Sequence, residues 1–146
     1  PLRFKVLLEL CRRFHEEPMN LGVQFSSSRD IYHHFQTRLG NLKQERFIIV
    51  ILDNKHRFLS ETTVTVGLLN RSLVHPREVF AEAIEQRAAA IICIHNHPSG
   101  DSSPSEEDKR ITRRLQESGE LLGIPLLDHI IISKEDFTSF AGEGWL

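Results

Sequence analysis

Residues 88–108 read AAAIICIHNHPSGDSSPSEED, and this stretch decides the fold. Its first part is an apolar run of strand length, which predicts a strand covered on both faces. Residues 98–100 are Pro-Ser-Gly, a sequence typical of a turn. A helix start follows, because Ser103 can cap, Pro104 fits the first helical position and Glu106 lies three residues after the cap. The stretch therefore predicts a strand, a turn and a helix in succession.

The segments on either side continue this alternation. We expect strands at residues 46–52, 57–66, 88–95, 126–133 and 137–140, and helices at residues 2–14, at 28–39, from Pro76 onward and from Pro104 to Gly123. Interleaved strands and helices indicate the α/β class. The expected architecture is a single mixed β-sheet flanked by helices, an α-β-α sandwich.

The composition is that of an ordinary globular protein. The chain has 146 residues, of which 40% are hydrophobic and 26% are charged, and this length suits a single domain. The formal net charge of −2 gives no electrostatic reason to expect nucleic acid or a membrane surface as a partner. No apolar run approaches the roughly 18 to 20 residues that span a bilayer, and charged residues interrupt the first segment, unlike a signal peptide.

Cysteine use indicates the compartment. Only Cys11 and Cys93 occur, and Cys93 lies in the apolar run as a small buried hydrophobe. A disulfide scaffold would need more cysteines in a shorter chain, so we expect a reducing cytoplasm. Because the chain begins at Pro1 and not at a methionine, we also expect a piece of a longer protein. The sequence carries no signature of an oligomeric state.

Two histidines end the predicted strand. His95 and His97 are two residues apart, so their side chains project from the same face, and paired imidazoles suit zinc. Asp108 falls in the first turns of the following helix, which the turn can bring back over the strand end as a third ligand. Three protein ligands leave a fourth position open for water, which is the pattern of catalytic rather than structural zinc.

Each of these residues also has a plainer interpretation. With eight histidines in the chain, pairs two apart arise by chance, and Asp108 can be an acidic residue favoured by the positive end of a helix. The placement favours a metal, because an apolar strand ending in two histidines and a turn is poorly suited to a packed core. Ser105 lies three residues before Asp108 on the same helix face, where its hydroxyl either points at the metal or caps the helix.

The run from His95 to Asp108 resembles the JAMM (MPN+) metalloprotease motif, which reads His-x-His, seven residues, Ser, two residues, Asp. Residues 45–47, 52–53, 76–80 and 128–130 extend the resemblance to the bacterial RadC family over residues 26–139. It implies the JAMM/MPN fold, a cytidine-deaminase-like α-β-α sandwich. It divides the chain into a helix and connector at residues 1–25 and a RadC-type JAMM domain at residues 26–146.

The resemblance also implies roles for single residues. His95, His97 and Asp108 would bind zinc, and Ser105 would stabilise the oxyanion. Glu45, which comes directly before the strand at residues 46–52, would be the general base.

Two further points stay open in the sequence. Glu61 and Glu78 are alternatives to Glu45 as the base. Asp128 and His129 begin a predicted strand, where they either orient a metal ligand or form a hydrogen-bonded strand start.

Full-length RadC proteins are also expected to carry a helix-hairpin-helix-like region, and residues 2–39 lack the Gly-rich hairpin of such a module.

The sequence and the resemblance together predict a zinc-dependent metallohydrolase, a metallopeptidase or isopeptidase that uses a zinc-activated water on a peptide or isopeptide substrate. The alternative is a DNA-repair-associated nucleic-acid or protein-binding module with a structural or vestigial metal site. The near-neutral charge and the lack of an aromatic and basic surface pattern count against nucleic acid. A third possibility is a protein-interaction domain that keeps the fold without turnover.

Overall fold

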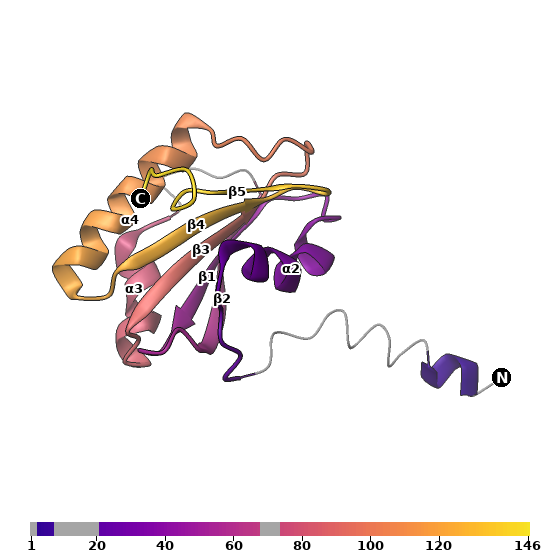
Figure 1. Cartoon of the computed structure of the whole chain (residues 1–146), viewed down its shortest axis with the longest axis horizontal. Coiled ribbons are helices and arrows are strands. Elements are labelled where there is room, and N and C mark those ends of the chain that lie inside the picture. Colours follow the sequence, from indigo (N-terminus) through magenta and orange to yellow (C-terminus); the bar gives the residue numbers. More distant parts are fainter. Residues whose placement is uncertain (1–2, 8–20, 68–73) are drawn as a thin grey trace.

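A five-stranded mixed sheet lies at the centre of this computed structural model (Figure 1), which describes residues 3–7, 21–67 and 74–146. Along the chain, the elements are α2 (Ser28–Leu39), β1 (Arg46–Leu52), β2 (Phe58–Val66), α3 (Pro76–Glu85), β3 (Ala90–Asn96), α4 (Glu106–Leu122), β4 (Leu126–Ile132) and β5 (Phe137–Ser139). The strand order is β2-β1-β3-β4-β5. The predicted α/β class, with a mixed sheet flanked by helices, is confirmed.

The middle of the sheet is covered on both faces. Every residue of β3 is buried, as are all residues of β1 except Arg46, in agreement with their continuous apolar runs. β1 is antiparallel to both β2 and β3, whereas β3 and β4 are parallel. Parallel neighbours need a crossover connection, which α4 supplies.

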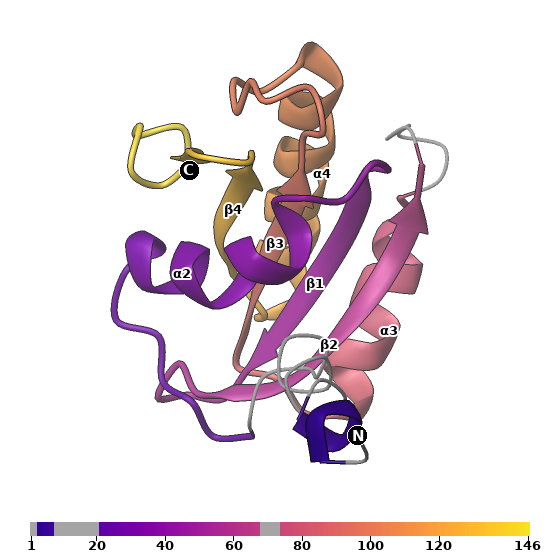
Figure 2. The same ribbon diagram turned by 90° about the vertical axis from the view of Figure 1, so that its right-hand side faces the viewer.

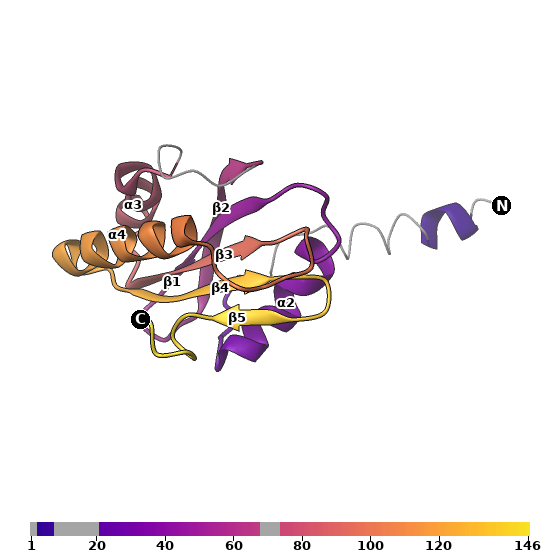
Figure 3. The same ribbon diagram turned by 90° about the horizontal axis from the view of Figure 1, so that it is seen from above.

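Helices cover the two faces separately, with α3 and α4 on one side of the strands and α2 on the other (Figure 3). α2 buries Ile31, Phe35 and Leu39 against one face. On the opposite face, α4 buries Ile111 and Leu115 against a second apolar core. Among the described helices, none combines the length and apolar character needed to cross a membrane.

The first predicted helices are only partly comparable with the structure. Residues 3–7 are helical, and the rest of the predicted helix at 2–14 lies outside the described residues. α2 has the predicted bounds, but its cap is Ser27, whose hydroxyl accepts a hydrogen bond from the backbone N–H of Asp30 at 3.1 Å. Ser28 is the first residue inside the helix.

α4 also begins later than predicted. Its N-cap is Ser105 and not Ser103. The reason is a reciprocal pair of bonds: Asp108 N–H donates to the Ser105 hydroxyl at 3.0 Å, and Ser105 N–H donates to the Asp108 carboxylate at 2.7 Å. The backbone N–H of Ser103 is bound by Asp101 at 2.9 Å, so Pro104 belongs to the loop before the helix.

One edge of the sheet collects the segments that carry the motif. Because β1 and β3 are antiparallel, the start of β1 lies beside the end of β3. The loop that follows β3 leads into α4 at the same edge (Figure 2). Residues that are far apart in the sequence therefore meet there.

Candidate metal centre

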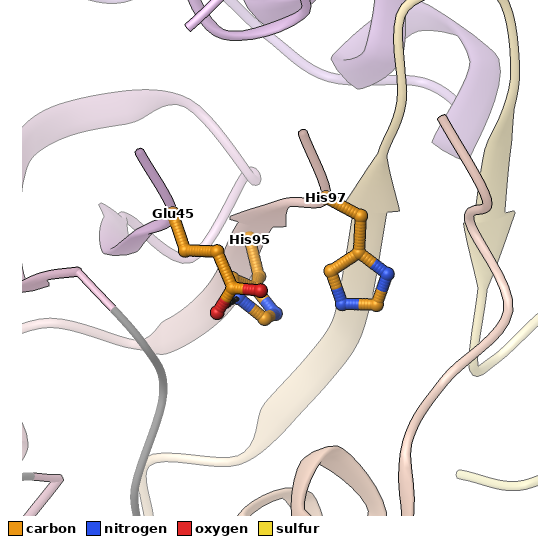
Figure 4. Close-up of side chains that lie close together, drawn as sticks. All are labelled: Glu45, His95 and His97. Atoms are coloured by element: carbon orange, nitrogen blue, oxygen red, sulfur yellow. Dashed lines mark hydrogen bonds and ion pairs between the residues drawn. The ribbon is translucent and has the colours of Figure 1, made fainter. Parts of the chain in front are cut away.

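The candidate centre is assembled from β3 and from the segment before β1. Phe47 pairs with His95, so Glu45, two residues before Phe47, lies beside the histidine end of β3. His97 follows β3, and its backbone N–H donates to the Ile132 carbonyl at 2.8 Å, which extends the parallel pairing beyond the strand. Figure 4 shows the side chains of Glu45, His95 and His97 gathered at this edge.

These three side chains lie within reach of one ion. One ligand atom from each of Glu45, His95 and His97 lies within 4.8 Å of the other two. Glu45 Oε2 is 3.3 Å from His95 Nε2. The His95 side chain is 1% exposed, whereas that of Glu45 is 23% exposed. The imidazole is therefore held inside the protein, and the carboxylate remains within reach of solvent.

Asp108 approaches the same two histidines from the first turn of α4. Its Oδ1 lies 3.3 Å from His95 Nδ1, and its Oδ2 lies 3.2 Å from His97 Nε2. The backbone N–H of Ser105 donates to Oδ2 and fixes the carboxylate at the positive end of the helix. The tertiary structure thus brings Asp108, buried, against both histidines of the motif.

The hydrogen bonding of His97 favours a cation at this point. Its Nδ1 lies 2.8 Å from the Asp101 carbonyl oxygen, which can only accept, so Nδ1 carries a proton. In the neutral ring, Nε2 is then a bare lone pair, yet it faces the Asp108 carboxylate. Two acceptors at this distance need a proton or a metal ion between them.

A second nitrogen also lacks a satisfactory partner. His95 Nδ1 is buried and makes no hydrogen bond of acceptable geometry, although Asp108 Oδ1 is near. Buried polar atoms are normally satisfied, so an unpartnered imidazole nitrogen beside a carboxylate favours a metal-binding role for both. Two imidazoles and a carboxylate are a donor set that fits zinc.

The pKa shifts in the cluster follow from these contacts. Burial alone would raise the pKa of Asp108, but the adjacent His95 and His97 rings and the hydrogen bond from the Ser105 amide outweigh it and hold that pKa well below its usual range. Burial alone would lower the pKa of His97, but Asp108 and the Asp101 carbonyl raise it above its ordinary value. The Asp108 carboxylate is therefore charged and available to a cation.

Ser105 lies next to the centre as the N-cap of α4, which confirms its capping interpretation. Its hydroxyl oxygen accepts from the Asp108 amide through a lone pair. A serine hydroxyl keeps one proton to donate while it accepts. Capping is therefore chemically compatible with the second interpretation, donation to an oxyanion.

Of the three glutamates considered as a base, one lies at the cluster. The Glu61 carboxylate is bound by the Arg38 guanidinium through two bonds, at 2.6 and 2.9 Å. Glu78 is exposed on α3, with Arg77 at 3.7 Å. Glu45 alone among these carboxylates contacts a histidine of the motif.

Sequence reasoning missed Asn96, which lies between the two histidines. Its Oδ1 accepts from the backbone N–H of Arg46 at 2.6 Å, and its Nδ2 donates to the Gln44 carbonyl at 2.9 Å. The amide thus binds the backbone on both sides of Glu45. Strand alternation could have supplied the signal, because it turns the middle residue to the face opposite the histidines, where a buried amide needs partners.

Asp128 has its partners away from the cluster. Its carboxylate accepts from the Ser139 hydroxyl at 2.6 Å and from the Ala141 amide at 3.0 Å. Burial raises its pKa, although these hydrogen bonds oppose the shift. His129 lies closer, with its ring centroid 6.2 Å from that of His95, and burial lowers its pKa to about 3. Asp128 therefore binds the segment that follows β4, whereas His129 lies beside the histidines of the candidate centre.

Comparisons with known proteins place these observations in a family context. A family model described as a RadC-like JAB domain matches residues 25–145. The chain is 48% identical over 142 residues to a UPF0758 protein of Syntrophotalea carbinolica, which corresponds to 97% of this chain and 63% of that protein.

Two other relatives give the same result. A UPF0758 protein of Thermotoga maritima is 43% identical over 145 residues, or 99% of this chain and 65% of that protein. One from Methanosarcina mazei is 46% identical over 143 residues, or 96% of this chain and 61% of that protein. The chain thus spans less than two thirds of the length of these relatives, whose names state no reaction or partner.

Proposed function

Because the chain belongs to the family of RadC-like JAB domains, we propose that it is a zinc-dependent hydrolase of the JAMM type that cleaves peptide or isopeptide bonds. The observation that carries the proposal is the position of the Asp108 carboxylate. It lies buried against His95 and His97, while Glu45 stands on the solvent side of the same histidine.

The proposed roles follow from burial and contacts. His95, His97 and Asp108 would hold the ion, since they lie on β3, directly after it and in the first turn of α4, and all three are largely shielded from water. When bound, zinc supplies a Lewis acid that polarises an amide carbonyl and lowers the pKa of a water molecule. Glu45 would accept the proton of the attacking water, and Ser105 would donate to the developing oxyanion.

The exposure of Glu45 distinguishes a base from a ligand. Glu45 lies close enough to the histidines to be a ligand as well as a base. A base has to exchange protons with water and substrate, and the partial exposure of Glu45 favours that role. We therefore assign Glu45 as the base and Asp108 as the third ligand.

The assignment is tested by metal analysis of purified variants. We expect about one zinc per chain in the parent protein, and loss of this zinc in His97→Ala. Asp108→Ala should also lose zinc, but it removes a cap bond as well, so His97→Ala is the cleaner variant. His34→Ala, on the exposed side of α2, is the matched control and should keep its metal.

Glu45→Gln separates the base from a ligand. It keeps the size and shape of the side chain and removes the charge. We expect full zinc content and a loss of peptide or isopeptide hydrolysis of about 100-fold or more. Zinc loss in this variant would make Glu45 a ligand and would overturn its assignment as the base.

A further inference from the structure

Another histidine lies inside the protein beside the candidate metal centre. His129, on β4, is fully buried and pairs with Cys93 of the neighbouring β3. Its ring stacks on Phe140, with centroids 4.7 Å apart and planes inclined by 14°. Phe47 meets it edge-on at 5.5 Å. The ring is therefore held in one plane, and the bonds of its two nitrogens decide what it can do.

The donor and acceptor roles around this ring can be assigned from the chemistry of its neighbours. Thr112 Oγ1 lies 2.6 Å from the Asp108 carbonyl oxygen and 2.6 Å from His129 Nδ1. The carbonyl only accepts, so the single hydroxyl proton of Thr112 goes to it. Nδ1 of His129 must then donate to Thr112 Oγ1. The bonds run from His129 through Thr112 to the backbone of Asp108.

The other nitrogen of the ring shows that a histidine at this position costs folding free energy. With the proton on Nδ1, Nε2 is a bare acceptor, and it is buried with no hydrogen-bond partner among the described residues. A buried polar atom left in this way costs about 1–3 kcal/mol. A phenyl ring would fill the same space against Phe140 without that cost. The hydrogen bond at Nδ1 is the only one that the His129 ring makes in the described structure, and a phenyl ring cannot supply it.

An ordinary helix feature accounts for only part of this arrangement. A threonine hydroxyl often bonds the carbonyl four residues earlier, and Thr112 would do so without any histidine. With that bond alone, the O–H of Thr112 could still rotate and donate to a different acceptor. A donor at Nδ1 of His129 removes this freedom, because it occupies a lone pair of Oγ1 and leaves the proton directed at Asp108.

We propose that His129 is a positioning residue of the metal centre, which holds the backbone of Asp108 through the hydroxyl of Thr112. The Asp108 residue is then fixed twice: its carbonyl by Thr112, and its carboxylate by the Ser105 amide. Residues that orient a metal ligand in this way typically change metal affinity by about 10- to 100-fold when altered. The inference rests on the proposed function, because it takes Asp108 as a ligand.

Three substitutions isolate the hydrogen-bond chain. His129→Phe keeps an aromatic ring on Phe140 and removes the donor. Thr112→Val keeps the shape of the side chain and removes the hydroxyl. Thr112→Ser restores the hydroxyl and should rescue the effect. We expect zinc affinity, measured by competition with a chromophoric chelator, to fall about 10- to 100-fold in the first two and to return in the third.

A core substitution on the other face of the sheet serves as the control for effects that come only from reduced stability. Phe35→Leu disturbs the packing of α2 without touching the centre, and it should bind zinc as the parent does. Cobalt substitution adds a readout of ligand geometry. The visible absorption bands of bound Co²⁺ should change in His129→Phe and Thr112→Val, and should stay the same in Phe35→Leu.

A measurement without metal tests the chain of bonds itself. Nitrogen-15 NMR of the metal-free protein should show His129 as the neutral form with its proton on Nδ1. A proton on Nε2 would overturn the inference, as would wild-type zinc affinity and cobalt spectra in both His129→Phe and Thr112→Val. Failure of the proposed function would be recognised separately, because His97→Ala would then bind zinc as tightly as the parent chain does.

Discussion

Single hydrogen bonds determine where the two acidic groups of the centre lie. Asn96 binds the backbone on both sides of Glu45, and Ser105 binds the carboxylate of Asp108. Both partners lie within the motif. Asn96 lies between the histidines, and Ser105 begins the helix that carries Asp108. The motif therefore contains side chains that hold the site in place as well as those proposed to bind the metal.

Asn96→Ala should destabilise the protein, because the Arg46 N–H and the Gln44 carbonyl lose their partner. We expect a loss of about 1–3 kcal/mol in the free energy of unfolding, measured by urea denaturation. Asn54→Ala, in an exposed turn, is the control and should change stability by no more than about 0.5 kcal/mol. Equal stability of the two variants would contradict a stabilising role for the two hydrogen bonds of Asn96.

Proton binding to His97 should make zinc affinity depend on pH. Its pKa is raised above the ordinary 6.5, because Asp108 and the Asp101 carbonyl together outweigh the opposing effect of burial. The protonated ring has no lone pair for a metal. As pH falls from about 8 to about 6, zinc affinity should therefore decrease, beginning above the ordinary histidine pKa. Competition titrations across this range measure it, and a constant affinity would contradict the shift.

At the level of elements, α4 is held close to the strand that follows it. Gly119 lies on the buried face of this helix, and a Cβ built there would be 2.5 Å from the Ile124 carbonyl oxygen and 3.3 Å from the Phe80 ring. The close approach requires glycine. It sets how closely the last turns of α4 approach the connection to β4.

Gly119→Ala should destabilise the protein although alanine favours helix formation by about 1 kcal/mol. The new methyl group meets backbone that cannot move aside easily, so we expect a net loss of about 1–3 kcal/mol in thermal or urea unfolding. Glu117→Ala, exposed on the same helix, should leave stability within about 0.5 kcal/mol. A more stable Gly119→Ala protein would show that α4 packs further from the sheet.

At the level of the whole molecule, the two apolar cores are formed by side chains other than those of the candidate centre. Neither core includes Glu45, His95, His97 or Asp108. The cores lie on opposite faces of the sheet, one under α2 and the other under α3 and α4. Folding therefore has its main driving force without a metal, unlike that of small domains built around a structural zinc.

Metal removal should consequently leave a folded protein. After chelation we expect the far-ultraviolet circular dichroism to be retained. Zinc at about 100 times its dissociation constant should stabilise the chain by about 2.7 kcal/mol, which raises the unfolding temperature by about 5–10 °C. The His97→Ala protein should show no such rise. Unfolding on chelation would indicate a structural zinc and would contradict a site at the edge of a preformed sheet.

Local sequence was enough for the parts of this protein that depend on neighbours along the chain. The apolar runs predicted the strands β1 and β3, and their strand-like length and β-branched content are visible without a structure. His95, His97 and Asp108 fall within one strand, turn and helix, so their approach could be predicted from spacing. Ser103 was the wrong choice of cap for α4, whereas the alternative, Ser105, was right. Serine is a common cap at either position, and only the contact with Asp108 selects between the two.

The tertiary structure decided everything that depends on which strands are neighbours. Glu45 reaches His95 because β1 pairs antiparallel with β3, and no local pattern states that pairing across 50 positions. The case against Glu61 as the general base also depends on a contact between distant segments, because its carboxylate is bound by Arg38 of α2. His129 meets Thr112 only because α4 crosses to a parallel strand. Side-chain spacing is a property of the chain, whereas contact between distant segments is a property of the packed sheet.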